Sequence, residues 1–339
     1  MESIVVNGGP TLHGSVATSG AKNAALPILL SALLADGTHE FDRVPVLRDI
    51  DSTELKLDRL RRFLQHPVQA FFNQRLNLWL AHETIAEDDE TFELDALENW
   101  HIKQRLSSDK LVDNETQADR LKAEGLLPHG PAALTSFARS RSEISGLIDK
   151  LEDYRLRKCE PFQFRLELAE DAGFIGQIND YYPGKGLMRY VVSKSKGKLL
   201  LALWLDHLVL CATNKFEHDD SSVLHSSDSI SRFTRLESDQ ALSQLQQYRM
   251  LYLQGLERPL PVFPQASFSW AKASSPEQAL KQAYRKWEGN QHMGIGGDKD
   301  DPYIKLILRG LTQNPLDSIE FESCASKIYH TLIENLVEV

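Results

Sequence analysis

The chain has 339 residues, of which 42% are hydrophobic, so it can build a sizeable core in one large domain or two smaller ones. A formal net charge of −10 and a pI near 5.6 exclude an overall basic surface, so any contact with nucleic acid must come from a local patch. The cysteines Cys159, Cys211 and Cys324 lack C-x-x-C or zinc-ligand spacing. We expect reduced thiols, no metal site and no cofactor.

The start of the chain contains no segment long enough to cross a membrane. Its most apolar stretch, residues 24–34, is shorter than the roughly 20 residues that span a bilayer, and a polar, glycine-rich lead precedes it. We therefore expect a soluble, cytoplasmic protein with no membrane partner.

Residues 1–52 predict a small β-β-α unit. Ile4-Val5-Val6 and Val16-Ala17-Thr18 flank the turn Asn7-Gly8-Gly9-Pro10, which predicts a hairpin. An apolar stripe over residues 24–33 then predicts a helix that Asp36-Gly37 ends. Below about 40–60 residues too little surface is buried, so we expect this unit to be an appendage without a core of its own.

The run Ser19-Gly20-Ala21-Lys22-Asn23-Ala24-Ala25-Leu26-Pro27-Ile28, followed by similar runs at 33–37 and 44–51, closely resembles the start of UDP-N-acetylglucosamine 1-carboxyvinyltransferase (MurA), the enolpyruvyl transferase of peptidoglycan synthesis. The resemblance implies that Lys22 and Asn23 lie where the family contacts its anionic substrates. A cation and an amide beside a helix N-terminus suit such groups.

Two features of the chain argue against transferase activity. In that family the catalytic cysteine stands in a Gly-Cys loop followed by Ile-Gly-x-Arg-Pro, and none of the three cysteines here has such neighbours. The resemblance also stops near Thr53, whereas the transferase builds its site between two full domains. We expect an anion-binding remnant without chemistry, through which the chain could form a homodimer.

From Ser52-Thr53 onwards the pattern changes to amphipathic helices. The first predicted helix carries Leu57, Leu60 and Leu64 on one face and ends before His66-Pro67. A second helix begins at that proline, and its aromatic-rich stripe, which runs from Val68 through Phe71, Phe72 and Leu76 to Trp79, is most simply explained as core packing.

Three strands and a series of helices follow along the chain. Alternation predicts strands at 163–168, 174–181 and 187–192, the last two joined by the turn at 183–186. An apolar helix is predicted over 199–211, where His207 is more simply a satisfied core histidine than a catalytic base. The Ser-rich segment 218–231 predicts a mobile loop. Helices are then predicted at 240–254, 277–288 and 318–336.

From about Leu57 to its end, the chain resembles the C-terminal region of the RecC (gamma) subunit of exodeoxyribonuclease V, the RecBCD helicase-nuclease. The runs 60–76, 203–209 and 288–290 carry the resemblance. Together the two resemblances imply two domains, a transferase-like fragment over 1–52 and a RecC-like domain over 53–339. The second resemblance implies an α/β fold in which a mixed sheet of the PD-(D/E)xK nuclease type is flanked by helices. The implied function is a non-catalytic scaffold that guides DNA, with the helicase-nuclease subunits and DNA as partners.

The residues themselves predict that this nuclease-like fold is inactive. Such nucleases need an acid at the end of one strand and an acid-x-lysine on the next, because carboxylates hold the divalent metal. Here Asn179 takes the first position, and Asp180 would point to the opposite face of the strand. No Asp or Glu occurs from Tyr181 to Leu205, so we expect no metal and no catalytic residue.

The stretch after Asp180 is instead basic and aromatic, which suits the backbone of a nucleic acid. The candidate DNA-binding residues are Lys185, Arg189, Lys194, Lys196 and Lys198, interleaved with Tyr181, Tyr182 and Tyr190. An alternative is a solvated basic edge that guards a strand against aggregation.

The remaining alternatives for the whole chain are the transferase itself and a rearranged reading frame whose product has no native role.

Overall fold

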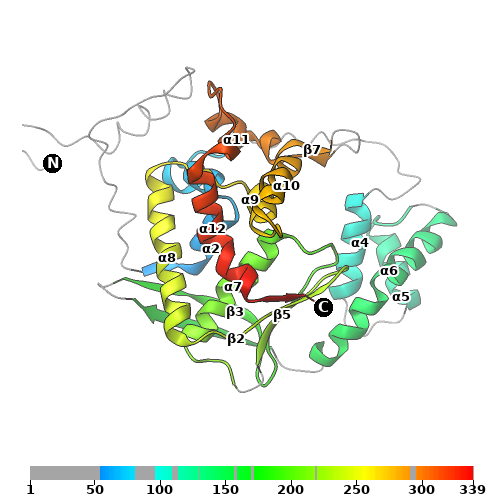
Figure 1. Cartoon of the computed structure of the whole chain (residues 1–339). Helices are drawn as coiled ribbons and strands as arrows, with labels where there is room; N and C mark the ends of the chain where they lie inside the picture. Colours follow the sequence, from blue (N-terminus) through cyan, green and yellow to red (C-terminus); the bar gives the residue numbers. More distant parts are fainter. Residues whose placement is uncertain are drawn as a thin grey trace, which may run out of the picture. The chain divides into compact units, whose positions relative to one another are not determined.

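The computed structural model describes residues 54–80, 96–108, 114–128, 130–155, 159–168, 172–217, 220–290 and 295–338. The expectations for residues 1–52, including Lys22 and Asn23, lie outside these ranges, so the domain boundary near residue 52 stays a prediction. The described part confirms a mixed α/β fold in which helices flank one large sheet (Figure 1). Within it, no helix is long and apolar enough to span a membrane.

The large sheet has seven strands within the described ranges, in the order β1-β3-β4-β5-β6-β9, with β2 also paired to β3. Parallel pairs join β1 to β3 and β4 to β5, and the other neighbours are antiparallel. The strands are β1 (Glu54–Lys56), β2 (Glu160–Glu167), β3 (Gly173–Tyr182), β4 (Gly186–Tyr190), β5 (Ser221–His225), β6 (Ile230–Phe233) and β9 (Leu336–Glu338), and a separate small pair consists of β7 (Gly289–Asn290) and β8 (Ile295–Gly296).

Helices precede, interrupt and follow the strands, and most of the predicted ones are confirmed. Their bounds are α2 (Leu57–Gln65), α3 (Pro67–Ala70), α4 (Ala96–Ser108), α5 (Asn114–Ala123), α6 (Ala132–Arg155), α7 (Gly197–Ala212), α8 (Ser238–Glu257), α9 (Pro264–Ala271), α10 (Pro276–Glu288), α11 (Pro302–Ile307) and α12 (Ile319–Glu334), with short η3 (Phe71–Arg75), η5 (Asp298–Asp300) and η6 (Pro315–Asp317). Helix α7 is apolar on all sides and nearly all of its residues are buried, so it forms the centre of the core.

The two faces of β4 pack against different groups of helices. Alternation along the strand directs Leu187 and Arg189 to one face, where Arg189 reaches α7. Met188 and Tyr190 point to the other face and join a hydrophobic cluster with α4, α5 and α6. These three helices, which sequence patterns did not predict, form a group beside the sheet (Figure 1).

The second predicted helix is confirmed only in its first turns. After the short α3, the backbone widens into the π-helix η3 and then leaves helical geometry at Asn77, whose φ of 52° is left-handed. Val68, Phe72 and Leu76 are buried as expected, but the prediction that Trp79 packs in the core is wrong, because 66% of its surface is exposed.

The expectation of a mobile loop over 218–231 is also wrong for the described residues from 220 onwards. They form the antiparallel hairpin β5–β6, in which Val223, Leu224, Ser222 and Ser231 are buried. The serines are compatible with burial because their small side chains fit tight spaces, and the Ser222 hydroxyl hydrogen-bonds His207 at 3.0 Å.

Candidate nucleic-acid interface

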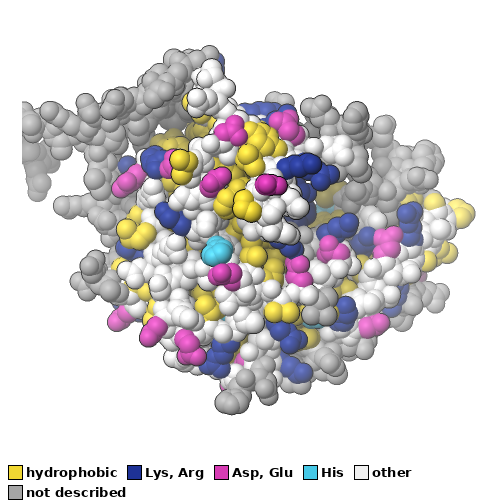
Figure 2. Space-filling view, viewed as in Figure 1, with side chains coloured by type: hydrophobic (Ala, Val, Ile, Leu, Met, Phe, Trp, Pro, Cys, Tyr) yellow, Lys and Arg dark blue, Asp and Glu magenta, His cyan; other side chains and the backbone are white. Residues whose placement is uncertain are grey.

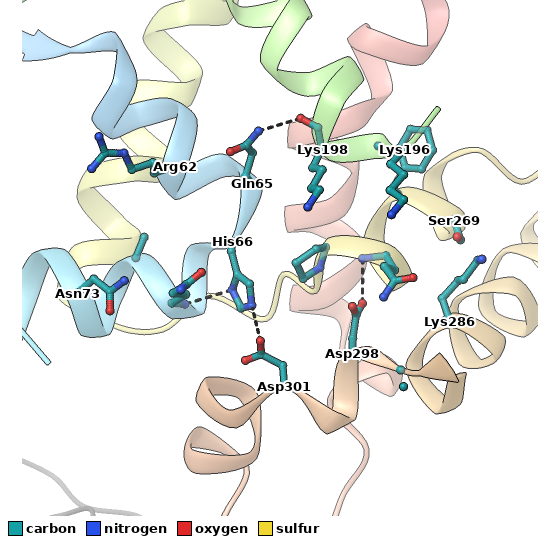
Figure 3. A pocket seen from close by; sticks show the side chains of 18 of the residues that line it. Arg62, Gln65, His66, Asn73, Lys196, Lys198, Ser269, Lys286, Asp298 and Asp301 are labelled. Carbon is teal, nitrogen blue, oxygen red and sulfur yellow. Dashed lines mark hydrogen bonds and ion pairs between the residues drawn. The ribbon is translucent and has the colours of Figure 1, made fainter. Parts of the chain in front are cut away.

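A cleft of about 1030 Å³ opens beside the start of α7. One wall comes from α2, α3 and η3, the opposite wall from α9 and α10, and the floor from the η5 region (Figure 3). Its polar lining includes Arg62, Gln65, His66, Gln69, Asn73, Gln74, Lys194, Ser195, Lys196, Lys198, Gln265, Ser269, Lys286, Asp298 and Asp301, and its apolar lining includes Ala70, Trp79, Pro264 and Phe268.

Five cationic side chains surround this cleft, and all five are exposed. They are Arg62, Lys194, Lys196, Lys198 and Lys286. Figure 3 shows Lys196 and Lys198 extending from the start of α7 into the cleft. Within the described ranges, none of the five forms an ion pair with a carboxylate, whereas charges of both signs are intermixed over the face shown in Figure 2. The cleft therefore concentrates positive charge on a protein that is acidic overall.

The two carboxylates of the cleft are both occupied by internal hydrogen bonds. Asp298 accepts from the backbone N–H groups of Gln265 and Ala266 at 2.9 and 2.7 Å, and its burial raises its pKa. Asp301 caps α11 and lies 3.3 Å from Nε2 of His66. Burial alone would raise the pKa of Asp301, but the hydrogen bond and charge of His66, together with the backbone N–H groups of Ile304 and Tyr303, outweigh burial and lower the pKa. These acids organise the floor rather than neutralise the lysines.

The loop that carries Lys194 and Lys196 is held in place by the β5–β6 turn. The backbone N–H of Ser195 donates to Asp228 at 2.9 Å, and the N–H of Ser227 donates to the carbonyl of Ser193 at 3.2 Å. Asp228 in turn accepts from the hydroxyl of Ser226 at 2.8 Å. The Ser-rich segment is therefore the support of the lysine loop.

Helix α7 begins inside the cleft, and its first turn adds to the positive field. Its N-cap residue, Lys196, makes no side-chain cap, and no acidic residue stands in the first turn. The uncapped N–H groups carry the positive end of the helix dipole. Gln65 of α2 donates to the carbonyl of Lys198 at 2.9 Å, which fixes the start of α7 relative to the wall that α2 forms.

Not all of the predicted DNA-binding residues lie at this cleft. Lys185 is exposed on the β3–β4 turn, away from the cleft lining. Tyr181 is buried, and its hydroxyl donates to Asp220 at 2.9 Å. Tyr182 and Tyr190 are half-buried against the α4–α6 cluster. The structure brings Lys194, Lys196 and Lys198 together and separates them from the three tyrosines.

Arg189 belongs to a buried ion network instead of a surface patch. Its guanidinium forms an ion pair with Asp206 of α7, whose side chain is fully buried, and lies 3.6 Å from Asp180. Arg61 of α2 binds the other oxygen of Asp206 at 2.6 Å and also pairs with Asp58. The network therefore ties α2, β4 and α7 together through paired charges.

The degenerate nuclease position has a geometry that the sequence did not reveal. Between Ile178 and Tyr181 strand β3 has a bulge, because Asn179 and Asp180 together lie opposite the single residue Pro161. Asn179 accepts a hydrogen bond from Gln177 and is exposed, whereas Asp180, at a φ of 62°, faces Arg189. The guanidinium of Arg189 therefore lies between the carboxylates of Asp180 and Asp206.

His207 is a core residue, as the simpler expectation had it. Both ring nitrogens are engaged, Nδ1 with Ser222 and Nε2 with the carbonyl of Thr234, each at 3.0 Å. Burial lowers the pKa of His207 to about 4, so the ring is neutral in the folded protein at pH 7. No described Cys, Asp or Glu joins it in a metal-binding cluster.

Comparison with known protein families gives a match over most of the chain. Residues 52–275 match the model of the RecC C-terminal domain. The chain belongs to the RecC C-terminal domain family. Its sequence is 28% identical to the RecBCD enzyme subunit RecC of Escherichia coli (strain K12) over 288 residues, which is 79% of this chain and 25% of that protein. The RecC subunit of Buchnera aphidicola subsp. Schizaphis graminum is 25% identical over 277 residues, and the chain spans about a quarter of the length of these relatives.

A second set of matches covers a short segment of the chain. The UDP-N-acetylglucosamine 1-carboxyvinyltransferase of Myxococcus xanthus (strain DK1622) is 61% identical over 59 residues, which is 17% of this chain and 14% of that enzyme. The corresponding enzyme of Bdellovibrio bacteriovorus is 60% identical over 57 residues. The chain thus joins segments that are similar to two different proteins, as the sequence resemblances predict.

Proposed function

We propose that this chain is a non-catalytic DNA-guiding scaffold of the kind that a RecBCD-type helicase-nuclease uses in DNA repair. The observation that carries the proposal is the cleft, where five exposed cations surround an uncapped helix N-terminus. Cations that neutralise phosphates release counterions, and this supplies most of the affinity in sequence-independent binding. Since the net charge is −10, we expect weak binding that depends strongly on salt.

The nuclease-like character of the fold is part of this proposal. The antiparallel strands β3 and β4, followed by α7 and by a strand β5 parallel to β4, support a PD-(D/E)xK-type arrangement. Strand β4 carries no Asp or Glu, and its Arg189 forms ion pairs with Asp180 and Asp206. A guanidinium between Asp180 and Asp206 repels a divalent metal, so the expected nuclease activity is nil.

Partner subunits of the helicase-nuclease type are expected because the relatives are subunits of the RecBCD enzyme. The chain spans about a quarter of the length of these relatives, so DNA binding and subunit binding are tested separately. Residues 1–52 contribute an anion-binding remnant at Lys22 and Asn23, and we expect them to be the contact in any homodimer.

Binding and cleavage assays together test the proposal. A fluorescent oligonucleotide should bind weakly at low salt and remain intact in Mg²⁺ or Mn²⁺. Replacing Lys194, Lys196 and Lys198 with Ala should weaken binding. The matched control replaces Lys185, Lys281 and Lys327, exposed lysines outside the cleft lining, and should bind like the wild type. Equal losses in both variants, or metal-dependent cleavage, would refute the scaffold.

The transferase is the second candidate, favoured only by the short matches of high identity. Lys22 and Asn23 could orient an anion, but a cysteine acid and a second domain are needed to complete the reaction. We expect no phosphate release from phosphoenolpyruvate above that of a Lys22→Ala variant. Release that depends on Lys22 would favour the transferase, and failure of both assays would favour a rearranged chain without a native role.

A further inference from the structure

One tryptophan ring at the cleft is largely exposed. Trp79 lines the cleft with 66% of its surface exposed, which is the largest exposed fraction among the described tryptophans. A single exposed aromatic ring is common on protein surfaces. Trp79 differs in that its ring lines a cleft bordered by cations, where it offers a large flat apolar face to a ligand.

The backbone around Trp79 is fixed on both sides. The N–H of Leu78 donates to the carbonyl of Phe72 at 2.9 Å, and the N–H of Leu80 donates to the hydroxyl of Tyr303 at 3.0 Å. Tyr303 is itself buried against Phe72. A ring that is exposed on a held backbone loses little conformational entropy when it stacks on a ligand, so it is prepared for binding.

A second aromatic side chain lines the cleft from α9. Phe268 is half-buried, packs against Tyr329 with ring centroids 5.5 Å apart, and lies so close to Gly197 that a Cβ there would be 2.4 Å from its ring. The lysines at the start of α7 line the same cleft. Apolar rings and cations therefore border one space, which matches a ligand with flat apolar faces and negative charges.

We propose that Trp79 is a stacking platform for an unpaired nucleobase, so that the cleft prefers single-stranded nucleic acid to duplex. The proposal rests on the proposed function and adds the class of ligand. Bases within a duplex are already stacked and paired, so their faces are closed to Trp79, whereas every unpaired base presents a face. The lysines bind the phosphates of either form, and only the ring distinguishes the two.

The experiment compares Trp79→Ala and Trp79→Phe with the wild type on a single-stranded oligonucleotide and on a duplex of equal length. Stacking contributes about 1–3 kcal/mol per base, which corresponds to a loss of about 5- to 150-fold. We expect Trp79→Ala to lose single-strand affinity by such a factor and to keep duplex affinity, and Trp79→Phe to keep most of both. Trp100→Ala serves as the control, since Trp100 is 39% exposed on α4 and outside the cleft lining.

The outcomes separate this inference from the function on which it rests. If the Lys194, Lys196 and Lys198 variant loses affinity for both forms while Trp79→Ala changes neither, the stacking platform is refuted and the scaffold stands. If Trp79→Ala weakens both forms equally, the ring contributes no preference and the proposal is again overturned. If the lysine variant binds both forms as tightly as the wild type, the proposed function itself fails.

Discussion

Positive charge occurs in two regions of the molecule, which differ in whether the cations form ion pairs with carboxylates. In the buried network, Arg61 and Arg189 both bind Asp206, whose side chain is fully buried. In the cleft, Lys194 and Lys198 are exposed and form no ion pair with a carboxylate within the described ranges, and the charge of Lys194 only helps to lower the pKa of the exposed Asp228. The first region uses its charges to join α2, β4 and α7, and the second leaves them available to a ligand. Composition alone does not distinguish these two uses.

The largest expected effect comes from breaking the buried network. Asp206→Ala leaves two guanidinium groups without their shared partner, and such a loss costs about 3–5 kcal/mol of unfolding free energy. Urea unfolding measures it. Replacing Arg61 and Arg189 with Met and Asp206 with Leu should recover most of that stability, because no buried charge is left unpaired and the two carboxylates that lose a partner, Asp58 and Asp180, are exposed to solvent. A loss below about 1 kcal/mol for Asp206→Ala would show that the network is not structural.

The next effect concerns acid stability, through His207 at the centre of the core. Burial lowers the pKa of this ring to about 4, so the stabilising neutral form is fully populated above the unfolded pKa of about 6.5. Stability is lost as the pH falls from about 6.5 towards 4, by about 3 kcal/mol in total. Between pH 7 and pH 4, the free energy of unfolding should fall more steeply with decreasing pH for the wild type than for His207→Phe. The same pH dependence of unfolding free energy in both proteins would contradict the burial of a neutral ring.

A smaller effect is expected at the turn that supports the lysine loop. Asp228→Ala removes the acceptor for the Ser195 N–H and the Ser226 hydroxyl, and because Asp228 is exposed the cost should be only about 0.5–1 kcal/mol. Hydrogen exchange at residues 193–196 should increase, and oligonucleotide affinity should fall less than in the triple lysine variant. An unchanged exchange rate would show that the loop does not depend on this turn.

The sequence predicts the central elements of the fold because their patterns are local. Alternation reveals β2 and β3, and a run that is apolar on all sides reveals α7. The serines of the β5–β6 hairpin predict a loop, because serine is common in loops. In the structure Ser222 and Ser231 are buried, as is the apolar pair Val223-Leu224. Helices α4 to α6 were missed because their apolar residues form no strong stripe.

The candidate site is less predictable, because it is assembled from segments that are far apart in the chain. Lys196 and Lys198 were predicted from local charge, but Arg62, Trp79 and Lys286 reach the same cleft only through tertiary packing. Arg189 was grouped with the lysines because both are basic, and the reason for separating them, Asp206, becomes visible only when α7 packs on β4. Local patterns give residue type and exposure, whereas pairing depends on the fold.

The salt dependence of DNA affinity tests the central claim most directly. With three or four phosphates neutralised, the log-log slope for the wild type should be about −2 to −4, and shallower on single strands than on duplex. Each lost phosphate contact changes the single-strand slope by about 0.7, so replacing Lys194, Lys196 and Lys198 should reduce its steepness by about 2, with an unchanged melting temperature. The control variant at Lys185, Lys281 and Lys327 should keep the wild-type slope. Identical slopes for the wild type and the cleft variant would contradict the account.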